Sequence, residues 1–264
     1  MSSSSSPSSQ SHSQRTASQF GPNAANYVAS AVHASGADLD ALAEMAGAAT
    51  PAHALDLGTG GGHVAYRLAR HARQVTAADL SPDMLRAVAA QAREMGFANI
   101  ETRTAAAESL PFADATFDFL ASRFSAHHWR DLAAGLRQSR RVLRAGAPAV
   151  FIDIVAPGRA LFDTHLQTVE LLRDSSHVRD YTLAEWFAAL TQAGFSIRSC
   201  RTWRLRMDFA VWTERMRTPA PLAQAIRLLQ EKAADETRAY FSTEDDGSFL
   251  IDAAWIDGVA VANG

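Results

Sequence analysis

Residues 52–63 read AHALDLGTGGGH, and the order of residue types in this stretch decides the fold. The short apolar run 54–57, which contains Asp56, is typical of a strand buried on both faces of a parallel sheet. The loop that follows contains the alternating glycines Gly58, Gly60 and Gly62. Glycine lacks a Cβ, so the backbone there can turn with positive φ and approach a bound nucleotide closely. The stretch therefore predicts the first strand and the ligand-binding turn of a nucleotide-binding α/β domain.

The loop departs from the dinucleotide fingerprint G-x-G-x-x-G, because its sixth position is His63. We expect residues 63–68 to continue as a helix whose first N–H groups face the ligand. The departure argues against a nicotinamide oxidoreductase, as does the lack of an obvious Tyr/Lys catalytic pair. A glycine-rich turn that binds nothing is the other alternative, and the next strand argues against it.

An acid ends the second predicted strand, residues 74–79 (QVTAAD), and stands 23 positions after Asp56. An acid at this distance from a glycine loop is placed to accept hydrogen bonds from a ribose diol. Asp79 is that acid. Its alternative role is to cap the following helix, but Ser81 is the better cap and Pro82 suits the first helical position.

Composition excludes several classes of protein. The chain of 264 residues has a net charge of −3 and 20% charged residues, so it has no basic excess for nucleic acid and no polybasic run for a membrane surface. Its one cysteine, Cys200, excludes an intrachain disulfide and a multi-thiolate metal site. No run approaches the roughly 18 apolar residues of a membrane span, and the N-terminus lacks the apolar segment of a secretory signal. We expect a cytoplasmic protein without a bound metal.

The chain divides into a serine-rich tail, residues 1–15, which we expect to be disordered, and a single domain, residues 16–264. The fold class is α/β: a doubly wound, Rossmann-like sheet of seven mostly parallel strands with an antiparallel last pair. Helical inserts at about 158–181 and 211–240 would form a lid over its carboxyl edge. The predicted strands are 54–57, 74–79, 100–105, 117–122, 149–155, 196–209 and 249–261. The predicted helices are 20–34, 37–46, 63–68, 85–95, 132–143, 161–173 and 183–193, and 211–240 is mostly helical.

Four stretches carry a family resemblance: DLGTGGG at 56–62, AADLSPDML at 77–85, AESLPFADATFD at 107–118 and RVLRAGA at 141–147. On these the chain resembles class I S-adenosylmethionine (SAM) dependent methyltransferases of the ubiquinone/menaquinone-biosynthesis-like group, with a methyltransferase type 11 domain. The similarity spans about residues 20–155. Four motifs in the right order are more specific than any one of them.

The resemblance implies a SAM cofactor, the product S-adenosylhomocysteine, and a set of residues that would bind them. The glycine loop, with Thr59, would lie beside the methionine part of SAM, and Asp56 near its amino group. Asp79 would bind the ribose hydroxyls, and Leu80 and Met84 would flank the adenine.

Adenine recognition departs from the family pattern. Ala106 stands where related sequences commonly have an Asp that contacts the adenine amino group. The contact would then depend on the Ala107 backbone and on Glu108. Arg123 opens the loop after the fourth strand, which in the family covers the methionine part, so we expect it to contact the cofactor.

Three side chains are candidates for catalysis. His127 or His128 could take a proton from a hydroxyl or amine acceptor, because an imidazole titrates near neutral pH. The alternative is that one caps the loop and the other packs beside Trp129, with at most one facing the acceptor. Tyr27 could form an aromatic wall around the sulfonium. Positioning of donor and acceptor would supply most of the rate.

The acceptor should meet the two helical inserts, and we predict a small molecule. Aromatic and apolar residues there suggest an apolar pocket, with ordinary core as the alternative: Phe162, Leu166, Trp186, Phe187, Trp203 and Trp212. A cationic cluster would suit an acidic acceptor, with solvated helix faces as the alternative: His165, Arg173, His177, Arg179, Arg215 and Arg217. The alternative function is a SAM-binding protein of the same fold that acts as a sensor or catalyses a reaction other than methylation. The oligomeric state stays open, with a homodimer among the options.

Overall fold

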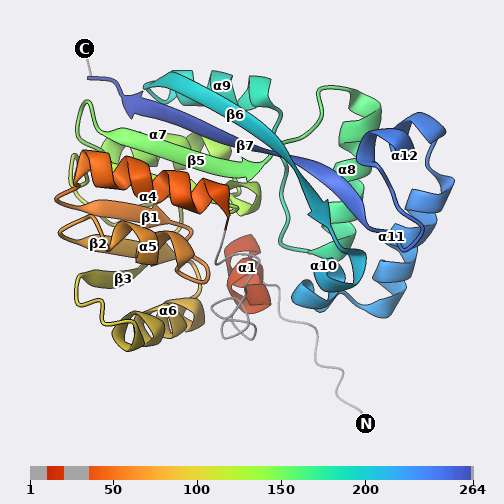
Figure 1. Cartoon of the computed structure of the whole chain (residues 1–264), viewed down its shortest axis with the longest axis horizontal. Helices are drawn as coiled ribbons and strands as arrows, with labels where there is room; N and C mark the ends of the chain where they lie inside the picture. The colour runs from red at the N-terminus through yellow and green to blue at the C-terminus, as the bar shows by residue number, and fades with distance from the viewer. Residues whose placement is uncertain (1–10, 21–35, 263–264) are drawn as a thin grey trace, which may run out of the picture.

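The computed structural model describes residues 11–20 and 36–262. Seven strands form one sheet in the order β3-β2-β1-β4-β5-β7-β6 (Figure 1). Strands β1 to β5 pair in parallel, whereas β7 runs antiparallel to both β5 and β6. This confirms the predicted fold class. The strands are β1 Ala54–Leu57, β2 Val75–Asp79, β3 Ile100–Thr104, β4 Phe119–Arg123, β5 Pro148–Ile154, β6 Phe195–Met207 and β7 Phe249–Ala260.

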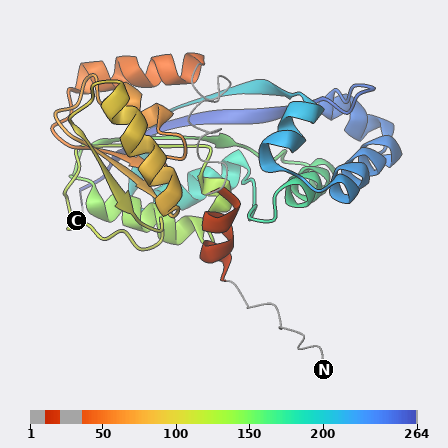
Figure 2. The ribbon, with the colours of Figure 1, turned by 90° about the horizontal axis from the view of Figure 1, so that it is seen from below.

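Helices cover both faces of the parallel strands, because side chains alternate between the faces along each strand. From β1, Ala54 joins the apolar cluster under α4 Ala37–Ala49 and α5 His63–Leu68, together with residues of α6 Pro82–Glu94. Leu55 and Leu57 join the opposite cluster, under α7 Leu132–Val142 and α9 Leu183–Gln192. Figure 2 shows α4 (orange) on one side of the sheet and α7 (green) on the other.

The start of α6 follows the sequence prediction. Ser81 is its N-cap and accepts a hydrogen bond from the Met84 N–H at 3.3 Å, and Pro82 occupies the first helical position. The helix therefore begins three residues before the predicted 85–95. The predicted fourth strand, 117–122, is shifted to β4 because Phe117 instead bridges to Leu143.

The two longest strands, β6 and β7, extend beyond the parallel part of the sheet and carry a second helical region (Figure 1). There α8 Ala160–Arg173, α10 Phe209–Met216, α11 Ala220–Lys232 and α12 Asp235–Phe241 pack around their own apolar cluster. The predicted helical insert 211–240 is thus three helices. The first break lies at Arg217, which has a left-handed φ of 52°, and Pro219, which has no N–H to continue α10. The second lies at Ala233 and Ala234, between α11 and α12.

A helix, α1 His12–Phe20, precedes the domain. Our prediction of a disordered tail through residue 15 is therefore wrong for residues 12–15, while residues 1–10 lie outside the described part. Polar contacts hold α1 against the domain: His12 Nε2 lies 3.1 Å from the His128 carbonyl oxygen, and Gln19 donates to the Met216 carbonyl at 3.2 Å. Beyond Phe20 the predicted helix 20–34, including Tyr27, lies outside the described residues.

Among the described residues, no helix combines the length and apolar character that crossing a membrane requires.

Candidate functional site

One cavity of about 690 Å³ lies at the carboxyl ends of the parallel strands, where open α/β sheets bind ligands. Ligand pockets commonly measure about 300–1,000 Å³. One wall, which we call the glycine-loop wall, comes from the loop after β1 and the end of β2. The opposite wall, which we call the histidine wall, comes from α1, the 3₁₀ helix η2 Ala126–His128, α8, β6 and α10. A single space therefore connects two chemically different surfaces.

The three glycines of the loop differ in what surrounds them. At Gly58, φ is +75° and a Cβ would lie 1.8 Å from Ser125 Oγ. At Gly62, φ is +84° and a Cβ would lie 2.6 Å from the Tyr66 ring, so packing of α5 demands glycine there. Gly60 has a φ of +48°, and the nearest atom to a Cβ is Met84 Cε at 4.0 Å. Gly58 and Gly60 line the cavity and Gly62 does not, so packing alone already accounts for glycine at position 62, and its place beside the ligand stays a prediction.

Asp56 is buried at the base of the glycine-loop wall, with 1% of its surface exposed. Its Oδ2 accepts hydrogen bonds from Thr59 Oγ1 at 2.6 Å and from the Ala65 N–H at 2.9 Å. Its Oδ1 has no hydrogen-bond partner among the described residues. Burial raises the pKa of Asp56 to about 7. Asp56 and Thr59 both line the cavity, so the unsatisfied oxygen suits a ligand that donates a hydrogen bond.

Asp79 holds the loop against the end of β2. Its Oδ2 accepts from the Gly60 N–H and its Oδ1 from the Ser81 N–H, both at 2.9 Å. Burial raises its pKa. Each carboxylate oxygen has further acceptor capacity, so these bonds still allow a ribose diol to bind. Leu80 and Met84 line the cavity beside it, and their place at the adenine stays a prediction.

Only some of the residues predicted to contact the adenine line the cavity. Ala107 and Glu108 line the cavity, but Ala106 does not, and it bridges instead to Ser109. Glu108 Oε1 accepts from the Arg130 N–H at 2.7 Å, so this carboxylate also fixes the approach to α7. A contact between Ala106 and the adenine therefore stays a prediction.

Arg123 lies at the cavity in an ion pair that sequence reasoning missed. Its Nε lies 2.5 Å from Asp38 Oδ2, and its guanidinium lies 4.6 Å from the centre of the Phe124 ring. Asp38 is in the first turn of α4, where an acid ordinarily signals only a favourable helix dipole. No local pattern could have paired it with a residue 85 positions away.

His127 forms a buried ion pair with Asp153 (Nδ1 to Oδ1, 2.5 Å). Burial alone would lower the pKa of His127, but the Asp153 carboxylate raises it to about 9. Asp153 Oδ2 also accepts from the Ala126 N–H at 2.8 Å, which fixes the carboxylate under η2. Sequence reasoning missed Asp153, although a charged residue inside the apolar run 149–155 was a signal.

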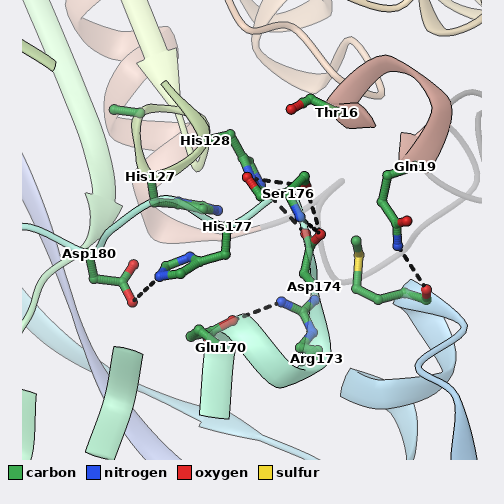
Figure 3. A network of polar contacts seen from close by, with 12 residues as sticks. Thr16, Gln19, His127, His128, Glu170, Arg173, Asp174, Ser176, His177 and Asp180 are labelled. Carbon is green, nitrogen blue, oxygen red and sulfur yellow. Dashed lines mark hydrogen bonds and ion pairs between the residues drawn. The ribbon is translucent and has the colours of Figure 1, made fainter. Parts of the chain in front are cut away.

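His128 is held differently. Its Nδ1 lies 3.1 Å from the Ser176 carbonyl oxygen, which can only accept, so Nδ1 carries the hydrogen and Nε2 is the accepting nitrogen. Burial and the neighbouring His127 charge lower its pKa to about 4. The two imidazole rings lie 4.2 Å apart and both line the cavity, because the tight turn of η2 directs adjacent side chains to one region (Figure 3). Both histidines reach the cavity, and the expectation that at most one faces the acceptor stays a prediction.

The residues predicted from the inserts separate into core and cavity. Trp203 and Trp212 line the cavity, whereas Phe162, Leu166 and Trp186 are core and Phe187 packs against it.

Of the predicted cationic residues, Arg173 and Arg215 line the cavity. Arg173 pairs with Glu170 at 3.1 Å, and Arg179 pairs with Asp163 and Glu185. His165 packs beside Phe241, with ring centres 5.2 Å apart.

Within residues 11–20 and 36–262, no group of three or more His, Cys, Asp or Glu side chains is arranged to hold a metal ion.

The sheet order and the cavity at its carboxyl edge define a Rossmann-like α/β protein. Residues 55–151 match the family model described as "Methyltransferase domain". The chain is 43% identical over 196 residues to the uncharacterized protein YafE of Escherichia coli, which covers 74% of this chain and 95% of that protein. It is 31% identical over 245 residues to the uncharacterized methyltransferase YcgJ of Bacillus subtilis, which covers 91% and 97%.

Solved structures agree with this. The crystal structure of YcgJ superposes with a TM-score of 0.81 at 29% identity, covering 85% of this chain and 98% of that one. A putative methyltransferase from Bacillus halodurans gives 0.82 at 29% identity, covering 86% and 100%. The chain belongs to the SAM-dependent methyltransferase family. The comparisons support methyl transfer and do not favour the alternative of a sensor or a reaction other than methylation.

Proposed function

We propose that the protein transfers a methyl group from SAM to a small-molecule acceptor held in the same cavity. The observation that carries this proposal is the continuity of the cavity, which is lined by Gly60 and Asp79 on one wall and by His127 and His128 on the other. Methyl transfer needs donor and acceptor in line and at close range, and one continuous space can hold both.

The residues of the glycine-loop wall fit SAM. The Oδ1 atom of Asp56, which has no hydrogen bond among the described residues, suits the amino group of the methionine part of SAM. The open space beside Gly60 would let this part of SAM lie close to the backbone of the loop. Asp79 would bind the ribose, Leu80 and Met84 would flank the adenine, and Ala107 and Glu108 would meet its edge. Arg123, fixed by Asp38, would close the methionine end.

SAM supplies an electrophilic methyl group on its sulfonium when bound. The chain's own contribution is to orient the acceptor and to accept its proton where one is lost. His127 keeps its proton near neutral pH because Asp153 holds it, so it would act as a fixed cationic donor. His128 stays neutral and can accept a proton at Nε2, but a pKa of about 4 makes it a weak base. Positioning would therefore supply most of the rate. Tyr27 stays a prediction for the sulfonium wall.

Calorimetry with SAM tests the cofactor half of this proposal. Asp79→Ala should abolish measurable SAM binding, because it removes the ribose acceptor and releases the Gly60 N–H. Asp83→Ala is the matched control, because it changes a half-exposed acid in the first turn of α6. It should bind SAM like wild type. Unchanged affinity in Asp79→Ala would remove the central claim.

The transfer itself is tested with labelled SAM and a metabolite extract, by following release of S-adenosylhomocysteine. His128→Gln should leave SAM affinity unchanged and lower turnover by about tenfold or more if the imidazole accepts a proton. Equal turnover would show that His128 takes no part in the transfer. Absence of any S-adenosylhomocysteine from wild type across extracts would contradict methyl transfer.

A further inference from the structure

The imidazole of His127 presents one of its two ring nitrogens to the cavity. Its Nδ1 lies 2.5 Å from Asp153 Oδ1, whereas no described residue forms a hydrogen bond with its Nε2. Nε2 is not one of the fully buried polar atoms that lack a partner, and His127 lines the cavity. This nitrogen is therefore open to a ligand in the cavity.

Asp153 fixes both the orientation and the protonation of this imidazole. Its Oδ2 accepts from the Ala126 N–H at 2.8 Å and from the His127 N–H at 3.3 Å, so the carboxylate also holds the backbone of η2. Burial opposes a charge on His127, but the Asp153 carboxylate raises the pKa of His127 to about 9. Near neutral pH both ring nitrogens therefore carry a hydrogen, and Nε2 donates into the cavity.

The other ionic groups of the histidine wall do not select a ligand by net charge. Arg173 pairs with Glu170, and Arg206 pairs with Glu244. The remaining titratable groups that act on the charge of His127 are His128, His177 and Asp180. Burial and the charge of His127 lower the pKa of both of these histidines, and burial raises the pKa of Asp180, so all three favour their neutral forms. Selection at this wall therefore depends on directed donors, of which His127 Nε2 is one.

The helix η2 places His127 where the two walls of the cavity meet. Ser125, directly before η2, packs against the glycine loop, since a Cβ on Gly58 would lie 1.8 Å from Ser125 Oγ. Trp129, directly after η2, donates from Nε1 to the same oxygen at 3.2 Å. A ligand group bound to His127 Nε2 would therefore lie next to the glycine-loop wall, where the proposed function needs the nucleophile.

The second histidine of η2 is a poor base. Burial and the charge of His127 lower the pKa of His128 to about 4. An acceptor that loses a proton during transfer, such as an alcohol, needs a base that titrates closer to neutral pH. An acceptor that arrives already deprotonated needs no base, and this is the kind of acceptor that the two histidines fit together.

We propose that the acceptor is an organic acid that binds as its carboxylate, with one oxygen hydrogen-bonded to His127 Nε2 and the other oxygen methylated to a methyl ester. This inference rests on the proposed function. The second carboxylate oxygen forms the bond to the methyl carbon, the carbon–sulfur bond breaks, and its electron pair stays on sulfur. No proton moves. A hydrogen bond between two charged groups is roughly twice as strong as a neutral one, and an ammonium group has no lone pair to accept from Nε2. His127 is then a catalytic residue, and Asp153 is a positioning residue that acts through it.

The stability of the product in base tests this proposal. Full-length protein is incubated with methyl-labelled SAM and with a metabolite extract that anion exchange has separated into an anionic and a non-anionic fraction. After SAM is removed, methyl esters release labelled methanol in base, whereas methyl groups on carbon, nitrogen, sulfur or an ether oxygen stay bound. We expect label transfer to the anionic fraction, with nearly all of it released as volatile methanol.

Two variants test the residues. His127→Gln keeps an amide donor but removes the charge, and should lower ester formation by about tenfold or more with S-adenosylhomocysteine affinity unchanged. His71→Gln, at an exposed position outside the cavity, is the matched control. In wild type, ester formation should fall above about pH 9, where His127 keeps only the hydrogen on Nδ1 that faces Asp153. In Asp153→Asn this fall should begin at a lower pH, because the carboxylate no longer raises the pKa of His127. A purely structural role of Asp153 would lower ester formation equally at every pH.

Base-stable label, or transfer mainly to the non-anionic fraction, would overturn this inference and leave methyl transfer intact. Unchanged ester formation in His127→Gln, or parallel pH profiles for wild type and Asp153→Asn, would also overturn it. If a variant fails to fold, seen as loss of S-adenosylhomocysteine binding, the lability of the wild-type product still decides. Absence of S-adenosylhomocysteine release from every fraction would instead contradict the proposed function.

Discussion

The two walls of the cavity are built in opposite ways. The glycine-loop wall comes from one continuous stretch, residues 56–84, and its key bonds join near neighbours, such as Thr59 to Asp56 and the Gly60 N–H to Asp79. The histidine wall draws on α1, η2, β6, α8 and α10, and its bonds cross the chain: His127 to Asp153, His128 to Ser176, and Gln19 to Met216.

The two walls differ in what their binding properties depend on. The glycine-loop wall works through backbone N–H groups and through missing Cβ atoms, which local sequence encodes directly. The histidine wall works through charges whose protonation depends on burial and on distant partners. Substitutions in the first should act on cofactor binding and stability, and substitutions in the second on pH dependence and acceptor binding.

The largest effect should come from Gly58→Ala. Its Cβ would lie 1.8 Å from Ser125 Oγ, and its φ of +75° is strained for alanine. We expect a loss of about 4 kcal/mol in the free energy of unfolding and loss of S-adenosylhomocysteine binding. Gly146→Ala is the control, because φ is +79° there and nothing lies within 4 Å of a Cβ. It should cost only about 1 kcal/mol. Equal costs in urea unfolding would show that packing against Ser125 is unimportant.

The second effect concerns pH and the Asp153–His127 pair. Below pH 6.5 the imidazole is protonated in both states, so the stabilisation by the ion pair is fully present. Between pH 6.5 and about 9 the folded protein keeps a proton that the unfolded chain releases, so the free energy of unfolding should fall by about 3 kcal/mol.

Asp153→Asn should abolish this slope, measured by urea unfolding at several pH values across the window. Asp257→Asn, which changes an acid on the adjacent strand β7, should keep it. Parallel pH profiles for wild type and Asp153→Asn would show that the carboxylate does not hold the proton on His127.

Gly60→Ala should separate binding from stability. No atom lies closer than Met84 Cε at 4.0 Å, so the fold should lose only about 1 kcal/mol from the positive φ. The added methyl would fill ligand space, and S-adenosylhomocysteine affinity should fall by about tenfold in calorimetry. A stability loss as large as that of Gly58→Ala, or unchanged affinity, would refute the distinction between the two glycines.

The smallest effect should come from Gln19→Ala, which removes the bond from α1 to the Met216 carbonyl. We expect a loss of about 1 kcal/mol in the free energy of unfolding, with cofactor affinity unchanged. Gln14→Ala, on an exposed position of the same helix, should leave both quantities unchanged. A loss of cofactor affinity in Gln19→Ala would mean that α1 also supports the glycine-loop wall.

Prediction from sequence succeeded where a local pattern has a local cause. The strand–glycine loop–helix order, the acid at the end of β2 and the Ser81 cap all concern residues within a few positions of one another. It was less accurate where tertiary packing decides the outcome. The helix η2 brings both histidines to the cavity, the packing of α5 requires glycine at position 62, and Pro219 separates α10 from α11.

The sequence by itself determined the α/β class, the glycine-loop wall and the membership suggested by four ordered motifs. Only the tertiary structure decided the chemistry of the opposite wall. No pattern in the sequence distinguishes four acids: Asp38, Asp153, Asp174 and Asp180. Folding buries Asp38 and Asp153 beside a cationic partner. It buries Asp174 and Asp180 with one oxygen each that has no hydrogen bond among the described residues. The physical reason is that the protonation and pairing of an acid depend on the groups around it in space, whereas the conformation of a backbone turn depends on its neighbours along the chain.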